Sequence, residues 1–88
     1  MKVIFGRQFK IAYKQRIESD AKLKALFEQS MALFIQNPQE PSIRTHRLHG
    51  ILADHYAFSV DFDCRVIFKK ISEDTILLVD IGNHDEVY

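Results

Sequence analysis

The sequence has one cysteine, no net charge and no long apolar run. Cys64 has no second cysteine in the chain with which to form a disulfide, which fits a reducing cytoplasm. Twelve basic and twelve acidic residues cancel, so any RNA or DNA site would have to be a local patch. The first ten residues, MKVIFGRQFK, match neither a signal peptide nor a membrane span, and we therefore expect a cytoplasmic protein.

The composition that is present is that of a small folded protein. Eighty-eight residues predict one domain over 1–88, and a hydrophobic fraction of 47% argues against disorder. No internal repeat or low-complexity tract interrupts it. A domain of this length folds around a small core.

Two apolar runs with helical spacing predict two helices after a short strand at residues 2–5 that ends at Gly6. The first helix is expected over 7–18, and the second starts after an N-cap at Ser19 or Asp20. Pro38 ends it near Asn37. The stripe is expected to hold Phe9, Ala12, Tyr13 and Ile17 in the first helix and Leu23, Leu26, Phe27, Ser30 and Phe34 in the second, widened by Met31, Leu33 and Ile35. The short link predicts an antiparallel helical hairpin.

The period changes to two after a loop at 37–43. We expect a strand over 44–48, a hairpin of two strands around a turn at 61–63, and a last strand over 75–81. Separate helices and strands predict an α+β fold, with the helical hairpin on one face of a small, mostly antiparallel sheet. The alternation predicts that Phe58, Val60, Val66 and Phe68 face the helices, while Ser59, Arg65 and Lys69 face the solvated side.

The segment RTHRLHG, residues 44–50, is the one locally basic stretch. It can be interpreted as an RNA-backbone contact made by Arg44, Arg47 and His49, together with Lys69 of the hairpin, with His46 or His49 able to move protons. It can also be a solvated edge strand whose charges discourage aggregation. A zinc site is disfavoured, because residues three apart on a strand point to opposite faces and no cysteine pair supports them.

Two further positions have both a functional and a structural interpretation. Arg65 could stabilise charge on a phosphate, or it could be a surface arginine paired with Asp61, Asp63 or Asp80. In the terminal stretch DIGNHDEVY, glycine would permit a sharp turn at Gly82.

Beyond that turn, His84 and Tyr88 would lie on the same side of one helical turn. Imidazole and phenol both carry protons and stack on bases. Alternatively, Val87 and Tyr88 cover the end of the core while His84 caps a turn.

Three motifs, in order, resemble those of the RelE/ParE superfamily of bacterial toxins, most closely its YafQ-like and RelE/StbE-type members. The pattern H-x-L-x-G corresponds to residues 46–50, and D-x-R-[VI]-[IV]-[YF] to residues 63–68. The closing pattern G-x-H-x-x-[VL]-[YF] corresponds to residues 82–88. The resemblance extends over essentially the whole chain, although the specific motifs lie in its second half.

The resemblance implies the toxin of a type II toxin–antitoxin pair. Such a toxin would be a metal-independent endoribonuclease, an mRNA interferase, that cuts mRNA in the ribosomal A site and needs no cofactor. By position, His46 and His84 resemble the family's acid and base, and Arg65 its phosphate-stabilising arginine. Asp63 matches a family aspartate, and Tyr88 matches the closing aromatic residue.

The chain also departs from the pattern of its relatives. Ser59 stands where some carry a histidine, Cys64 where they carry an aromatic residue, and Asp80 where some carry an arginine. The superfamily also contains ParE-type inhibitors of DNA gyrase, and a non-catalytic module bound by an antitoxin is a further alternative. The implied partners are mRNA, the ribosome and a cognate antitoxin, whose acidic or amphipathic segment would wrap the helices or cover the basic strand, for example in a heterotetramer.

Overall fold

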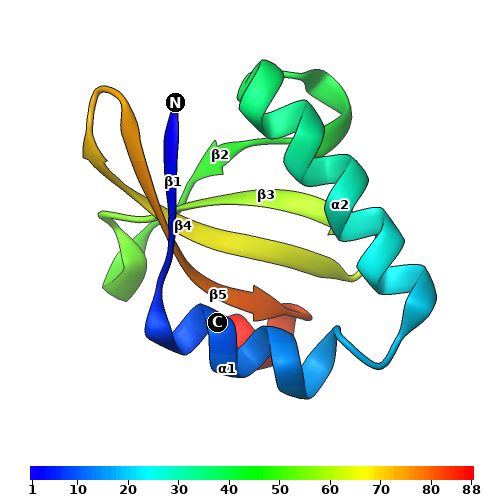
Figure 1. Cartoon of the computed structure of the whole chain (residues 1–88). Coiled ribbons are helices and arrows are strands. Elements are labelled where there is room, and N and C mark those ends of the chain that lie inside the picture. The colour runs from blue at the N-terminus through cyan, green and yellow to red at the C-terminus, as the bar shows by residue number, and fades with distance from the viewer.

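The computed structural model describes all 88 residues, and three helices and five strands make up the fold. The helices are α1 (Arg7–Arg16), α2 (Ala21–Gln36) and α3 (His84–Val87), and two short 3-10 turns are η1 (Pro41–Ile43) and η2 (Gly50–Leu52). The strands are β1 (Lys2–Phe5), β2 (His46–Arg47), β3 (Tyr56–Asp61), β4 (Cys64–Ser72) and β5 (Thr75–Gly82). They form one sheet in the order β1-β5-β4-β3-β2, mostly antiparallel, with β1 parallel to β5 (Figure 1). The α+β prediction, with the N-terminal helices on one face, is confirmed.

Helix α1 begins directly after Gly6 because the chain passes very close to β5 there. The amide of Gly6 donates to the carbonyl of Leu78 at 3.0 Å, and a Cβ at Gly6 would lie 2.5 Å from that oxygen. Glycine is therefore required by space. The helix ends at Arg16, two residues earlier than predicted, and buries Phe9 and Ala12.

Helix α2 starts and stops where its capping residues predict. The Asp20 carboxylate accepts from the amide of Leu23 at 3.1 Å, and the helix ends at Gln36, before Pro38. Its buried residues are Phe27, Ser30, Met31 and Phe34. The prediction that Leu33 and Ile35 widen the stripe was wrong, because both are exposed. The helix has protein on one side only, so a narrow stripe is sufficient.

The two helices share one face of the sheet, and their connection is short. In Figure 1 they diverge from that connection, with α1 along β5 and α2 leading away toward β3. Aromatic rings fill the space beneath them: Phe9 lies 5.8 Å from Phe27, and Phe34 stacks 4.6 Å from Phe58 (ring centroids). Together they belong to a core of 15 buried residues that fixes the helices on the sheet.

The strand hairpin has the predicted alternation. Phe58, Val60, Val66 and Phe68 belong to the core beneath the helices. Ser59 is opposite Arg65 in the register, so both belong to the other face. Between β4 and β5 the register shifts, because Ile67 pairs with Asp80 and Phe68 with Leu78. The residue between them, Val79, forms a bulge.

The predicted strand over 44–48 is much shorter in the structure. Arg44 has a left-handed backbone, with φ of 52°, where it closes η1, and this conformation cannot be part of a strand. Strand β2 therefore contains only His46 and Arg47. The predicted loop at 37–43 likewise contains the turn η1.

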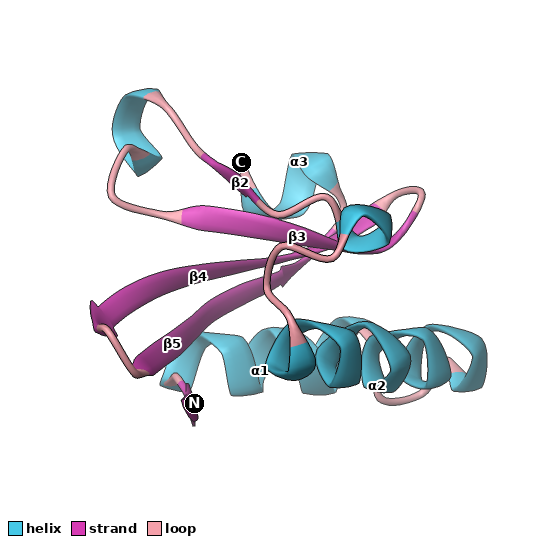
Figure 2. Cartoon of the chain, turned by 90° about the horizontal axis from the view of Figure 1, so that it is seen from above, coloured by secondary structure: helices cyan, strands magenta, loops and turns pink.

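The second face of the sheet, which the alternation predicted to be the solvated side, is partly covered. Figure 2 shows α1 and α2 on one side and η2 and α3 on the other. Leu48, Ala57 and Ile67 form a small buried cluster there, and Leu52, Val79 and Val87 pack against it. This cover forms because residues that end η2 and α3 are apolar and fold back onto β3, β4 and β5.

Candidate functional site

Arg65 lies near the middle of a row of residues that crosses the second face. It pairs with Ser59 on β3 and with Gly82 on β5. Its side chain is partly buried and makes no ion pair, whereas Asp80 is paired with Arg16. The interpretation of Arg65 as one half of a surface salt bridge is therefore wrong, and its guanidinium is free to meet an anion.

Helix α3 brings His84 and Tyr88 to this arginine. The two rings meet edge to face with centroids 4.7 Å apart, as expected for one helical turn. The guanidinium carbon of Arg65 lies 5.5 Å from the centre of the Tyr88 ring, a cation–π distance. His84 and Tyr88 are 65% and 46% exposed. An imidazole, a phenol and a guanidinium therefore meet at a surface that solvent can reach.

A capping box holds the short helix α3 in place. The Asn83 side chain accepts from the amide of Glu86 at 2.9 Å, and Glu86 accepts from the amide of Asn83 at 2.7 Å. His84 is thus not the cap of this turn. Val87 packs on the small cluster, as the structural interpretation predicted, but Tyr88 remains exposed.

Glycine is favoured at position 82 for a reason that differs from the expected one. Its backbone does not have the positive φ that favours glycine. A Cβ there would lie 2.7 Å from the Glu86 Oε1 and 3.0 Å from the Arg16 Nη1. The glycine therefore leaves room for two side chains that meet above it.

His46 belongs to the same face but stands further away. It pairs with Ala57 on β3, and Ala57 in turn pairs with Ile67 on β4. From the spacing of strands and residues, the Cα atoms of His46 and Arg65 are roughly 10–12 Å apart. Two long side chains at that separation can both contact one nucleotide, although they do not touch each other.

The ring of His46 is fixed by a backbone carbonyl. Its Nδ1 lies 2.9 Å from the carbonyl oxygen of Arg44, which can only accept, so Nδ1 donates. In the neutral ring, Nε2 then has a free lone pair. The residue that provides this carbonyl, Arg44, is also the residue with the left-handed backbone.

The other predicted site residues lie on the second face, at its edges or, for Arg47, on the helix side of the sheet by register. Asp63 lies in the exposed turn after β3 and makes no hydrogen bond or ion pair. Arg47 donates through Nε to the carbonyl of Ala53 at 3.2 Å and lines a hollow with Lys69. His49 is exposed and precedes η2. These residues are not brought into contact with Arg65.

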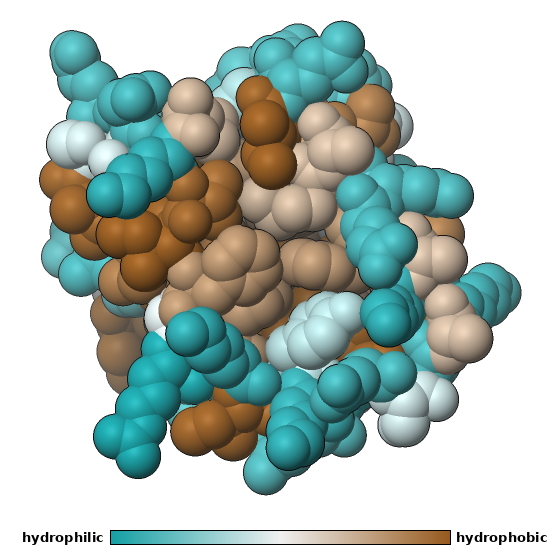
Figure 3. All heavy atoms as spheres, in the orientation of Figure 1, coloured by the Kyte–Doolittle hydropathy of each residue, from teal (hydrophilic) through white to brown (hydrophobic).

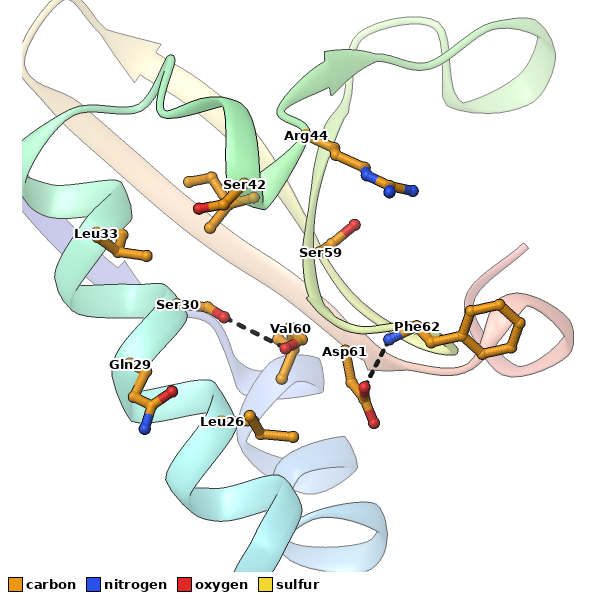
Figure 4. Close-up of a pocket in the computed structure, with 11 residues that line it drawn as sticks. Leu26, Gln29, Ser30, Leu33, Ser42, Arg44, Ser59, Val60, Asp61 and Phe62 are labelled. Carbon is orange, nitrogen blue, oxygen red and sulfur yellow. Dashed lines mark hydrogen bonds between the residues drawn. The ribbon is translucent and has the colours of Figure 1, made fainter.

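Arg44 lies closer to the site than its neighbours in the basic segment. Figure 4 shows its side chain and the Ser59 hydroxyl on the same side of β3, away from α2. Both residues line a pocket of about 380 Å³ between α2, η1 and β3, where Ser30 donates to the Val60 carbonyl at 3.4 Å (Figure 4). Arg44 and Arg65 therefore flank Ser59.

Cys64 faces away from the site. Its side chain is part of the core under the helices, and burial, reinforced by the charges of Asp61 and Glu86, raises the pKa of its thiol to about 11. The thiol is therefore protonated near neutral pH. Cys64 therefore belongs to the core and not to the candidate site.

No group of three or more histidine, cysteine, aspartate or glutamate side chains is arranged to hold a metal ion. His46 lies on β2, while His49 precedes η2. The H-x-x-H spacing thus has no third ligand.

The family of the chain follows from its sequence. A sequence model described as "Bacterial toxin of type II toxin-antitoxin system, YafQ" matches residues 1–88. The chain belongs to the YafQ toxin family. The resemblance to RelE/ParE-type toxins is thereby confirmed. A search of curated proteins gave no match.

Solved structures of YafQ-type toxins share this fold. YafQ from E. coli strain BL21(DE3) is 19% identical, with a TM-score of 0.78 over 99% of this chain and 97% of that one. The same toxin in the E. coli DinJ–YafQ complex matches over the same shares at 19% identity, with a TM-score of 0.75. A YoeB/ParE toxin from Agrobacterium tumefaciens is 14% identical, with a TM-score of 0.75 over 96% of this chain and 99% of that one.

Three features of this YafQ-family chain were not singled out from its sequence. The N-x-x-E pattern of Asn83 and Glu86 is a capping-box signature and could have been recognised. Arg16 gave no signal, because its partners lie at the other end of the sequence. Phe62 is 97% exposed at the tip of the β3–β4 turn. Only the residues next to it in the sequence could have indicated that position.

None of the helices combines the length and the apolar character that crossing a bilayer requires.

Proposed function

We propose that this protein is an endoribonuclease that cuts mRNA in the ribosomal A site and so inhibits translation. The observation that carries the proposal is the meeting of Arg65, His84 and Tyr88, with His46 on the same face. Membership of the YafQ family supports it. These four groups suit a reaction that moves two protons and builds charge on a phosphate.

In the proposed reaction, the ribose 2′-hydroxyl attacks the adjacent phosphorus. The new bond joins the 2′-oxygen to phosphorus, the bond to the 5′-oxygen breaks, and the products are a 2′,3′-cyclic phosphate and a 5′-hydroxyl. His46 takes the 2′-proton on its free Nε2, since Nδ1 is held by the Arg44 carbonyl. His84 protonates the departing 5′-oxygen.

Arg65 stabilises the negative charge of the pentacoordinate phosphate. Its guanidinium is well placed for this because it has no carboxylate partner of its own. Tyr88, which lies between Arg65 and His84, stacks on a base or steadies both groups. Asp63 lies in the turn beside the site, and we place it at the edge of the proposed catalytic group. The nucleophile comes from the substrate, so we expect cleavage to persist in EDTA.

The neutral total charge hides an uneven distribution that suits a polyanion. Residues 1–24 contain seven basic and two acidic residues, so the remaining chain is net negative. Exposed lysines and arginines of α1, such as Arg7, Lys10 and Lys14, can contact ribosomal RNA while Arg44, Arg47, His49 and Lys69 contact the mRNA backbone. Binding to ribosomes should therefore weaken as salt rises.

A cognate antitoxin is the proposed protein partner. Figure 3 shows apolar side chains gathered in the centre of the helical face, ringed by hydrophilic ones. A hollow of about 440 Å³ there is lined by aromatic residues of β1, α1 and α2, and two lysines and two glutamates surround them: Lys10, Lys14, Glu18 and Glu28. An amphipathic segment fits this combination. In the DinJ–YafQ complex, the E. coli toxin is bound to DinJ. Co-purification with the product of a neighbouring gene tests this.

The decisive experiment combines primer extension on cellular mRNA after induction with cleavage of RNA by purified variants. Arg65→Met and His84→Ala should each lower the cleavage rate by about 10²–10³-fold, or roughly 3–4 kcal/mol. Lys24→Met, which removes an exposed positive charge from α2, is the matched control. A 2′-deoxy substitution at the cut site should abolish cleavage.

The outcome also separates the alternative functions. Fully active Arg65→Met and His84→Ala variants would show that the site is misassigned. DNA damage and filamentation without mRNA cuts would favour a ParE-type gyrase inhibitor. The absence of any toxicity would favour a module that only binds its antitoxin.

A further inference from the structure

Arg16, the last residue of α1, lies at an open part of the sheet edge. Strand β1 pairs with β5 only as far as Leu78, so the end of β5 has no strand beside it. The Arg16 Nη1 donates to the carbonyl of Ile81 at 2.9 Å and lies 3.2 Å from the Asp80 carboxylate. A side chain thus replaces the missing strand at this point.

The same guanidinium also reaches α3, on the other side of the sheet. Its Nε lies 3.6 Å from the Glu86 Oε2, while the second oxygen of Glu86 accepts from the amide of Asn83 in the capping box. The side chains of Arg16 and Glu86 are only 24% and 37% exposed. Glu86 therefore links α1 to the turn that carries His84 and Tyr88.

We propose that Arg16 is a positioning residue, which holds α3 in the orientation that brings His84 and Tyr88 against Arg65. This inference rests on the proposed nuclease function. A four-residue helix is unstable by itself and depends on tertiary contacts. Val87 anchors α3 to the small apolar cluster, and the Arg16–Glu86 pair anchors it to α1.

The geometry requires an arginine and not merely a positive charge. Nη1 faces the strand while Nε faces α3, so one planar group serves two elements at once. A lysine has a single ammonium group and would have to choose between Ile81 and Glu86. Arg16→Lys should therefore give an intermediate effect in each measurement below.

The test compares Arg16→Met with Lys24→Met, which removes an exposed positive charge from α2. Arg16→Met should speed hydrogen exchange at the amides of Glu86, Val87 and Tyr88, which donate within α3, and leave core amides unchanged. It should lower the single-turnover cleavage rate by about tenfold or more, because small misplacements of catalytic groups are costly. Binding of a 2′-deoxy RNA that cannot be cut should stay within about twofold.

Glu86→Gln provides a second variant in case Arg16→Met does not fold. Glutamine keeps the capping-box acceptor but loses the charge. It should change exchange in α3 and the cleavage rate in the same direction as Arg16→Met, and less. Since both variants remove one link, the double variant should be no worse than Arg16→Met alone.

Normal exchange in α3 with normal cleavage in Arg16→Met would overturn the inference. So would equal losses in Lys24→Met, or losses that add in the double variant. If the wild-type protein cuts no RNA, the proposed function fails by itself. Exchange in α3 then decides whether Arg16 positions the turn.

Discussion

The two faces of the sheet differ in how much of their surface is buried. Beneath α1 and α2, a core of 15 buried residues contains stacked rings such as Phe34 and Phe58. On the other face, three buried residues support a surface that carries Arg65, His84 and Tyr88. Neighbouring residues on one strand thus alternate between the core and the face of the proposed site. In this small protein, the site can change without disturbing most of the packing.

Two adjacent residues on β3 provide the strongest test of the difference between the two faces. Phe58→Ala should lower the free energy of unfolding by about 3–5 kcal/mol, because the ring is fully buried and a cavity remains. Ser59→Ala, one position along and on the other face, should change it by less than about 0.5 kcal/mol. Urea denaturation of the two variants measures the difference. Similar losses would show that the second face also holds the fold together.

Cys64 and Arg65 provide a second pair, and here pH is the probe. Burial raises the pKa of the Cys64 thiol from 9.0 to about 11, so the folded state keeps its proton where the unfolded state has lost it. Stability from this group is therefore complete below pH 9 and is lost as pH rises toward 11, by about 2–3 kcal/mol. Cys64→Ala should lack this part of the alkaline loss in urea titrations at pH 8 and 10.5. Identical profiles for the two proteins would contradict a buried thiol.

Two glycines, Gly50 and Gly82, provide the smallest effect on stability. Gly50 has φ of +73° with open space around its Cβ position, so Gly50→Ala should cost about 1–2 kcal/mol through backbone strain and leave the site intact. Gly82→Ala meets the Oε1 and Cβ atoms of Glu86 and the Nη1 of Arg16, so it should cost about 1 kcal/mol and displace both side chains. NMR shifts of His84 and Tyr88 should move only in Gly82→Ala. Unmoved shifts would mean that the pair adapts to the methyl group.

Local patterns made most of the fold predictable. The period-two run of β3 and β4 predicted which side of the hairpin Phe58 and Arg65 occupy, and Asp20 and Pro38 marked the limits of α2. The short length of β2 could not be read in this way, since it depends on the backbone of Arg44. Nor could the folding of η2 and α3 onto the second face.

The prediction of the site missed contacts between residues that are far apart in the sequence. His84 and Tyr88 were placed together by helical spacing, but Arg16 meets Asp80 and Glu86 only through the fold. Periodicity describes a residue and its near neighbours, and it contains no term for such distant pairs. The same limit hid the space requirement at Gly82.

The parallel pairing of β1 with β5 has a kinetic consequence. Lys2 must find Thr75, so a loop of about 70 residues has to close before this part of the sheet exists. Contacts of such separation form late and slow the folding of small proteins. Until β1 pairs with β5, the unpaired edge of β5 is open to any other extended chain. The rate at which β1 pairs therefore decides whether a foreign strand binds there instead.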